Sequence, residues 1–302
     1  MKDVYISCIA DFLKIIDEQA HMYRSNGIIS NPKQLHFLYR GMENKKYKLI
    51  PNLYREEYIT GTLLGNERQV TSLPRYLSYA AEFDILYSFI HEASGYELRI
   101  KDEEISKWVV LAQHHGAPTR LLDWSSNPLV SLYFACQSKT KDDAVVWMLH
   151  TWNYTDYALH QKVEKTELTL AELLGHIVRC NGKGAGIPAM PYIYTPNYFD
   201  LRMSAQSSYF LVWGSDPRPL EDMVPSEYWM RSKCDVLATG NRPDDLDDKR
   251  FLYRVLIKSQ DKTAIIHQLD LLGINEKTLF PGLDGIGKYV ERKYRLDGNE
   301  VD

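Results

Sequence analysis

The sequence has little that would commit it to a metal, a membrane or a polyanion. Its four cysteines, Cys8, Cys136, Cys180 and Cys234, are widely spaced and form no paired zinc-ligand pattern. The net charge of −4 gives no overall attraction to nucleic acid or anionic lipid. No stretch approaches the roughly 18 apolar residues that span a bilayer, and the first residues lack the basic segment and apolar core of a signal peptide. We therefore expect a cytoplasmic protein with no membrane partner.

What remains is ordinary globular composition. The 302 residues are 44% apolar and 25% charged, with no internal repeat, low-complexity tract or clear linker, which favours one domain. Helical spacing of apolar residues occurs near 3–24, 73–91, 102–114, 128–136, 169–179, 262–272 and 287–294. Strands are predicted near 35–40, where the first strand ends at Arg40, and near 119–124, 144–149, 208–213 and 251–257. This order predicts an α+β fold, a single β core with N-terminal helical additions.

Polar residues concentrate in the run LAQHHGAPTRLLDWSSNPLVSLYFAC, residues 111–136. Ser126 or Asn127 is suited to cap a helix whose first residue is Pro128. A helix N-terminus beside Arg120 and the adjacent histidines would suit an anionic ligand. The alternative is structural, with Arg120 and Asp123 as a buried ion pair and the histidines as core groups. By contrast, we expect Glu82 and Asp84 on the solvated face of the 73–91 helix.

The same run closely resembles the signature of the FRG domain family. The family's namesake motif, an aromatic residue followed by Arg-Gly, is present as Tyr39-Arg40-Gly41, and residues 279–285, LFPGLDG, resemble its closing motif. The resemblance implies an N-terminal helix at 1–34, an FRG domain at 35–290 and a C-terminal tail at 291–302. Where the family usually carries a glycine after its Ala-Gln pair, this chain has Ser207-Ser208, which implies a changed turn.

A looser resemblance connects the chain to the arginine-type ADP-ribosyltransferases. The strand ending in Tyr39-Arg40-Gly41 is similar to their first motif, residues 119–135 to the second, and Arg202 with Gln206 and the following strand to the third. The resemblance implies a mixed or antiparallel β core like the ADP-ribosyltransferase fold, with NAD as the substrate. It lacks a clear Glu-x-Glu or Gln-x-Glu pair.

This resemblance gives the candidate site residues their expected roles. Arg40 would grip phosphate, and Asp123 or Gln206, with Glu221 as a third choice, would stabilise a developing cation. His115 completes the candidate catalytic set, and no metal is expected because adjacent histidines point in different directions. Candidate NAD-binding residues are Tyr39, Arg40, Gly41, His114, Thr119, Arg120, Trp124 and Tyr133. We expect Arg40, His115, Asp123 and Gln206 to converge on one pocket.

These expectations together favour an NAD-consuming ADP-ribosyltransferase-like enzyme, the toxin or effector of a bacterial toxin–antitoxin or antiphage system. Its partners would be NAD, an RNA, DNA or protein acceptor, and an antitoxin protein that masks the cleft. Two alternatives stay open: a non-catalytic nucleotide-sensing or interaction domain, and a metal-dependent nuclease or hydrolase that uses the histidines with Asp123. The glycine-rich segment 181–186 lacks a P-loop ending and is interpreted as a flexible loop, with a lid over the cleft as the alternative.

Overall fold

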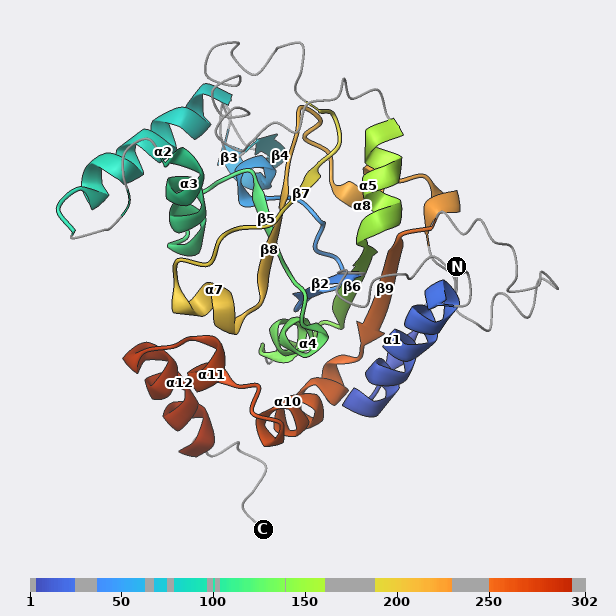
Figure 1. The fold of residues 1–302 in the computed structure, drawn as a ribbon. Helices are drawn as coiled ribbons and strands as arrows, with labels where there is room; N and C mark the ends of the chain where they lie inside the picture. The colour runs from blue at the N-terminus through green and yellow to red at the C-terminus, as the bar shows by residue number, and fades with distance from the viewer. Residues whose placement is uncertain are drawn as a thin grey trace.

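The computed structural model describes residues 4–24, 37–62, 68–74, 79–96, 100, 104–138, 140–160, 188–229 and 250–294. Within these residues the chain forms an open, mixed seven-stranded sheet with helices packed around it, and a separate two-stranded hairpin (Figure 1). The predicted α+β class is therefore confirmed. The predicted helix at 169–179, the glycine-rich segment 181–186 and an acidic run at 244–248 lie outside the described residues.

The sheet places the Arg40 strand at its centre. Its strand order is β1 (Tyr5–Ile6), β9 (Leu252–Ile257), β6 (Ala144–His150), β2 (Phe37–Met42), β5 (Leu121–Ser125), β8 (Ser208–Val212) and β7 (Tyr192–Tyr194). All neighbouring strands are antiparallel except β1, which pairs in parallel with β9. The N-terminal strand thus belongs to the same sheet as one of the last strands of the chain.

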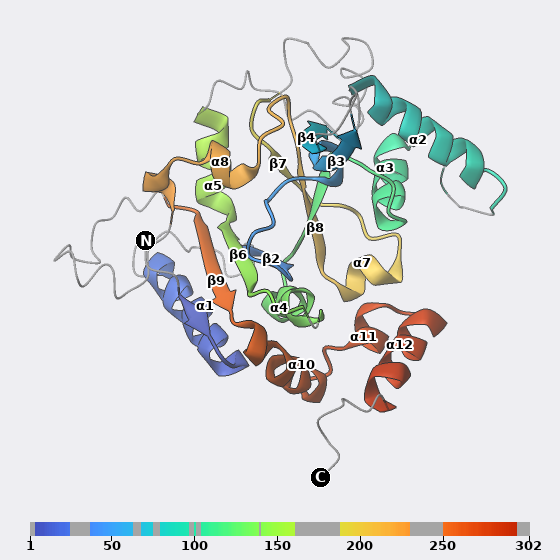
Figure 2. The same cartoon turned by 180° about the vertical axis from the view of Figure 1, so that it is seen from behind.

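Three buried clusters surround the sheet. The first lies between the sheet and the helices α1 (Ile9–Arg24), α4 (Pro128–Cys136) and α10 (Lys262–Leu271). The second lies toward α5 (Thr151–His160) and α8 (Leu220–Met223), with the short 3-10 turns Asn52–Tyr54 and Ser226–Tyr228 nearby. The third joins α2 (Tyr79–Ala93) and α3 (Ile105–His114) to β5 and β8. Figures 1 and 2 show α2 and α3 on one side of the molecule and α1 on the other.

Local sequence explains the elements nearest the centre. Strand β6 is buried at every position, as its nearly continuous apolar run predicts. Helix α4 begins at Pro128, and the side chain of Asn127 accepts a hydrogen bond from the Leu129 amide at 3.0 Å. Both features agree with the predicted helix start, since an Asn cap satisfies an amide that has no partner within the helix.

Three boundaries differ from the sequence prediction. Strand β2 continues to Met42 instead of ending at Arg40. Strands β3 (Glu56–Thr62) and β4 (Arg68–Pro74) pair with each other, and the helix predicted at 73–91 begins only at Tyr79, as α2. The helix predicted near 3–24 begins only at Ile9, and Tyr5–Ile6 form strand β1. For β1 and for the end of β2, pairing with a strand far along the chain decides the structure, and a local pattern does not report that partner.

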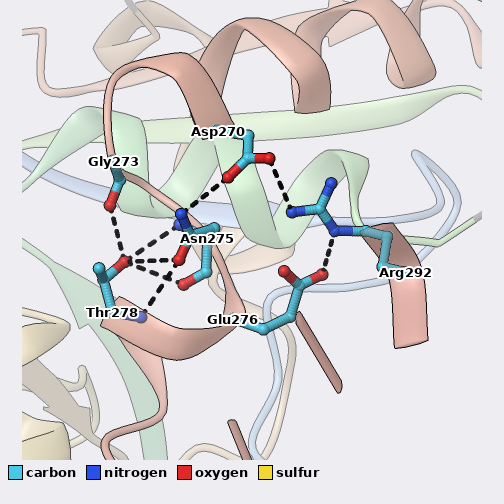
Figure 3. Close-up of polar contacts among 6 residues, drawn as sticks. All are labelled: Asp270, Gly273, Asn275, Glu276, Thr278 and Arg292. Carbon is cyan, nitrogen blue, oxygen red and sulfur yellow. Dashed lines mark hydrogen bonds and ion pairs between the residues drawn. The ribbon is translucent and has the colours of Figure 1, made fainter. Parts of the chain in front are cut away.

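Polar side chains connect the three C-terminal helices. A short 3-10 turn, Ser259–Asp261, leads into α10, and Gly273 follows that helix with a φ of +79°. Helix α11 (Glu276–Leu279) starts at an Asn275–Thr278 capping box, and α12 (Leu283–Tyr294) follows. In Figure 3, Arg292 of α12 reaches Glu276 at 2.7 Å and Asp270 at 3.3 Å, which links all three helices.

The helix α7 (Leu201–Ala205) lies beside α11 in both views of the fold. No helix within the described ranges is both long enough and apolar enough to cross a membrane.

Candidate functional site

A pocket of about 350 Å³ lies where β2 and β5 separate. Strand β2 pairs with β6 along all six of its residues, but with β5 only at Tyr39 and Ser125. The lining of the pocket comes from β2, α3, β5, α4, α7 and β8, elements that are far apart in the sequence. Its volume falls at the lower end of the range typical of small-molecule sites, roughly 300–1,000 Å³.

Arg40 reaches across the gap between the two strands. Its Nη1 donates a hydrogen bond to the main-chain oxygen of Asp123 and lies 3.8 Å from the Asp123 carboxylate. The side chain is only 16% exposed, and its Nε is a buried donor with no acceptor within the described part of the chain. Burial lowers the pKa of Arg40 to about 10, against the opposing effect of the Asp123 charge. The guanidinium therefore stays charged at neutral pH and faces the pocket.

Gly41 explains why glycine follows this arginine. A Cβ atom built on Gly41 would lie 1.7 Å from the main-chain oxygen of Ser131 and 2.7 Å from the amide of Ala135. Helix α4 thus rests directly on the backbone of β2, and only glycine leaves room for it. In the Arg-Gly pair, Arg40 lines the pocket and Gly41 contacts the backbone of α4, the helix that forms one wall.

A chain of hydrogen bonds holds the Asp123 carboxylate. Gln113 Nε2 donates to Asp123 Oδ2 at 2.9 Å, and Thr119 Oγ1 donates to Gln113 Oε1 at 2.6 Å. The amide of Leu121 in turn donates to Thr119 Oγ1 at 3.1 Å. Asp123 remains 56% exposed and is free to approach a ligand, whereas Thr119 is buried. Thr119, predicted to bind a ligand, does not line the pocket, and its hydroxyl donates to Gln113 instead.

The turn between α7 and β8 closes another wall. Ser207 has a φ of +49°, the left-handed region that glycine prefers, at the place where the resemblance led us to expect a changed turn. Its main-chain oxygen accepts from the Ser126 amide at 3.0 Å, and the Gln206 oxygen accepts from Ser125 Oγ at 2.7 Å. The side-chain nitrogen of Gln206 donates to the Leu279 oxygen at 3.0 Å. Gln206 therefore joins the second and third motif regions to the LFPGLDG segment.

His114 and Arg202 complete the polar lining. His114 Nε2 lies 3.9 Å from Asp200, the residue whose carboxylate caps α7. Burial, and then the charge of Arg202, lower the pKa of His114, so this histidine is neutral at pH 7. The guanidinium of Arg202 lies 4.8 Å from the centre of the Phe280 ring, and burial lowers its pKa.

Of the candidate residues, the structure brings Tyr39, Arg40, Gly41, His114, Asp123, Trp124 and Gln206 to the pocket. Tyr39 and Trp124 are largely core residues there, at 5% and 3% exposure. Four others lie elsewhere. His115 is exposed outside the pocket and stacks on Phe89 at 6.5 Å, because consecutive helical residues point in different directions.

Arg120 is fully buried and bound to Glu82, with hydrogen bonds of 2.8, 3.0 and 2.6 Å. This corrects both the ligand role given to Arg120 and the solvated position expected for Glu82. The alternative of a structural ion pair was right in kind, but the partner is Glu82 and not Asp123.

Tyr133 and Glu221 are also structural. Tyr133 is buried beside Glu276, away from the pocket, and burial raises its pKa. Glu221 accepts a hydrogen bond from the Leu49 amide at 3.0 Å, and burial raises its pKa. Neither lines the pocket.

Sequence reasoning missed several charged or polar lining residues, notably Gln113, Glu43 and Arg55. Gln113 stands directly before the paired histidines in the signature, which is the one signal that could have found it. The pocket lining therefore contains three guanidinium groups, those of Arg40, Arg55 and Arg202. It contains two carboxylates, those of Glu43 and Asp123. This balance favours an anionic ligand. The described residues contain no group of three or more His, Cys, Asp or Glu side chains placed to hold a metal ion.

The fold and pocket thus define an α+β protein with a polar, arginine-lined site at the centre of its sheet. Residues 35–144, which run through β2 to the start of β6, match the family model of the FRG domain. The matched region includes Arg40, Gln113, Asp123 and all of α4, whereas Arg202 and Gln206 lie beyond it. No curated protein and no solved structure matches the chain.

Proposed function

We propose that this protein is an NAD-consuming ADP-ribosyltransferase-like enzyme. One observation carries the proposal. Each of the three motif regions contains one strand, and these strands, β2, β5 and β8, lie next to one another in the sheet. Their adjacency brings Arg40, Asp123 and Gln206 to one pocket although the residues span most of the chain. A sheet that resembles the ADP-ribosyltransferase fold is part of this proposal.

The pocket has the groups that the reaction requires. The bond between nicotinamide and ribose breaks with its electron pair leaving on nicotinamide, and the ribose carbon develops positive charge. The Asp123 carboxylate, held by Gln113, is placed to stabilise that charge. Arg40 is placed to bind the diphosphate. An oxygen or nitrogen of the acceptor then bonds to the ribose carbon and loses its proton, for which Glu43 is the second carboxylate in the lining.

The cellular setting belongs to the same proposal. The enzyme would act in the cytoplasm as the effector of a toxin–antitoxin or antiphage system, on an RNA, DNA or protein acceptor. An antitoxin protein would then cover the pocket mouth. These statements rest on the family resemblance and on the open, polar character of the pocket.

One observation favours a second candidate, a nucleotide-sensing domain without catalysis. At the third-motif position stands Gln206, whose amide nitrogen is already engaged by the Leu279 oxygen. Asp123 is then the single carboxylate on the motif strands that reaches the pocket. A protein with this lining could bind a dinucleotide and change its contacts with a partner without breaking a bond.

A matched set of variants separates the two candidates. Purified protein is incubated with NAD labelled in the adenylate part and with cell extract, and free nicotinamide and labelled acceptor are measured. Arg40→Ala should lose both NAD binding and label transfer. Asp123→Asn keeps an oxygen that accepts from Gln113, so it should retain binding while nicotinamide release falls about 100-fold or more. Asp216→Asn, an equal change in charge at a residue outside the pocket, should leave both unchanged.

Binding of NAD without nicotinamide release by the wild-type protein, in any extract, would establish the second candidate. Wild-type activity in Arg40→Ala would refute both candidates, because each depends on this guanidinium.

A further inference from the structure

Arg202 differs from Arg120 and Arg292, two arginines of the described residues that are paired with carboxylates. Arg120 binds the carboxylate of Glu82, and Arg292 binds those of Glu276 and Asp270. Within the described chain, the guanidinium of Arg202 has no hydrogen-bond acceptor and no carboxylate at ion-pair distance. Arg202 lines the pocket, and its guanidinium lies over the face of the Phe280 ring.

The ring is itself firmly held. Phe280 packs edge-to-face against Phe134 of α4, with ring centres 6.1 Å apart and planes at 90°. The preceding residue, Leu279, accepts the hydrogen bond from Gln206, one turn along α7 from Arg202. The planar guanidinium therefore lies over a fixed surface, an arrangement that preorganises its donors.

A half-buried guanidinium without a carboxylate partner costs free energy unless an anion binds to it. Burial disfavours the charge, as the lowered pKa of Arg202 reflects, and the Asp123 and Asp200 carboxylates oppose that effect only from a distance. Asp123 accepts a hydrogen bond from Gln113 and lies 3.8 Å from Arg40, and Asp200 caps α7, so neither carboxylate is at ion-pair distance from Arg202. Arg55, the third arginine of the lining, is exposed and donates to the Ile50 oxygen.

We propose that Arg202, held on Phe280, is a second anion-binding residue of the pocket and takes one phosphate of a nucleoside diphosphate while Arg40 takes the other. The inference rests on the proposed function in that NAD contains such a diphosphate, and it names how the ligand is divided between two guanidinium groups. It also gives the LFPGLDG segment a role, since Phe280 presents Arg202 to the ligand.

Binding measurements test whether Arg40 and Arg202 each bind one phosphate of the ligand. Dissociation constants of ADP-ribose, ADP, inorganic pyrophosphate and adenosine are determined by calorimetry for the full chain. Arg202→Gln should weaken ADP-ribose, ADP and pyrophosphate about 10- to 100-fold, the loss of one charge-assisted contact, and leave adenosine unchanged. Arg202→Lys keeps the charge but not the planar fork and should recover part of the loss. Phe280→Leu should weaken the same three ligands several-fold, because it removes the ring face but keeps apolar packing.

Arg218→Gln is the matched control. It removes one guanidinium that is paired with Asp216 and lies outside the pocket, so all four affinities should stay at wild-type values. Melting temperatures of all variants establish that they fold.

The outcomes separate this inference from the proposed function. A folded Arg202→Gln protein that binds pyrophosphate and ADP-ribose like the wild type overturns the inference, whether or not NAD is consumed. A phosphate-selective loss in Arg202→Gln together with no NAD consumption by the wild type supports the subsite and removes the enzymatic proposal. Failure of the wild type to bind any of the three phosphate ligands defeats both.

Discussion

Replacing Gly41 with alanine tests the central packing contact of the site. The added methyl group would stand 1.7 Å from the Ser131 oxygen, where ordinary contact begins at 3.4 Å, so α4 and β2 must separate by about 1.7 Å. Helix α4 contributes to the buried first cluster, so the shift disturbs the core as well as the pocket wall. Overpacking of this kind costs about 3 kcal/mol or more when both partners are backbone. At roughly 2 °C per kcal/mol for a chain of this size, we expect the melting temperature to fall by at least about 6 °C.

Gly287→Ala makes the same chemical change where there is space. Gly287 lies within α12, and a Cβ there meets nothing within 4 Å. Because alanine favours a helix more than glycine does, this variant should be more stable by about 0.5–1 kcal/mol. Thermal unfolding and titration with ADP-ribose are measured on both variants. A Gly41→Ala protein with the melting temperature and affinity of the wild type would show that α4 does not press on β2 next to Arg40.

Three further changes test other parts of the structure. Glu82→Gln leaves the buried Arg120 cation without its carboxylate and should destabilise the protein by about 3–5 kcal/mol in urea unfolding, whereas an effect below about 1 kcal/mol would contradict the buried pair. Ser207→Gly relieves a φ of +49° and should stabilise by about 0.5–1 kcal/mol in the same assay; a loss of stability would argue against the left-handed turn. Because the folded-state pKa of His114 is lowered from 6.5, the unfolded chain takes up the proton first as pH falls. Stability should therefore drop below about pH 6.5, and this drop should shrink in His114→Gln; an unchanged pH profile in that variant would refute the assignment.

The helices and strands that could be predicted are those determined by residues close together in the sequence. The apolar run of β6 and the Asn127-Pro128 start of α4 each carry their own signal, and both appear as expected. The strand that carries Arg40 was also recognised, but its end was misplaced. Gly41 was interpreted as a strand terminator, whereas the structure uses it to admit α4, a helix about 90 residues further along the chain.

What could not be predicted depends on partners far apart in the sequence. Arg120 and Glu82 are 38 residues apart, and nothing near either residue indicates the other. His114 and His115 are adjacent in the sequence, and only the folded structure shows that His114 lines the pocket and His115 does not. Arg202 lies in a recognisable motif, but its exposure to the pocket depends on the distant Phe280.

The placement of Leu279 and Phe280 has a consequence for synthesis on the ribosome. Strands β2, β5 and β8 can pair once about two thirds of the chain has been made, but the segment that anchors Gln206 and supports Arg202 has not yet been translated. A nascent chain therefore passes through a stage in which Arg40 is in place and Arg202 has no ring beneath it. The capacity to hold a diphosphate would arise only in the final seconds of translation.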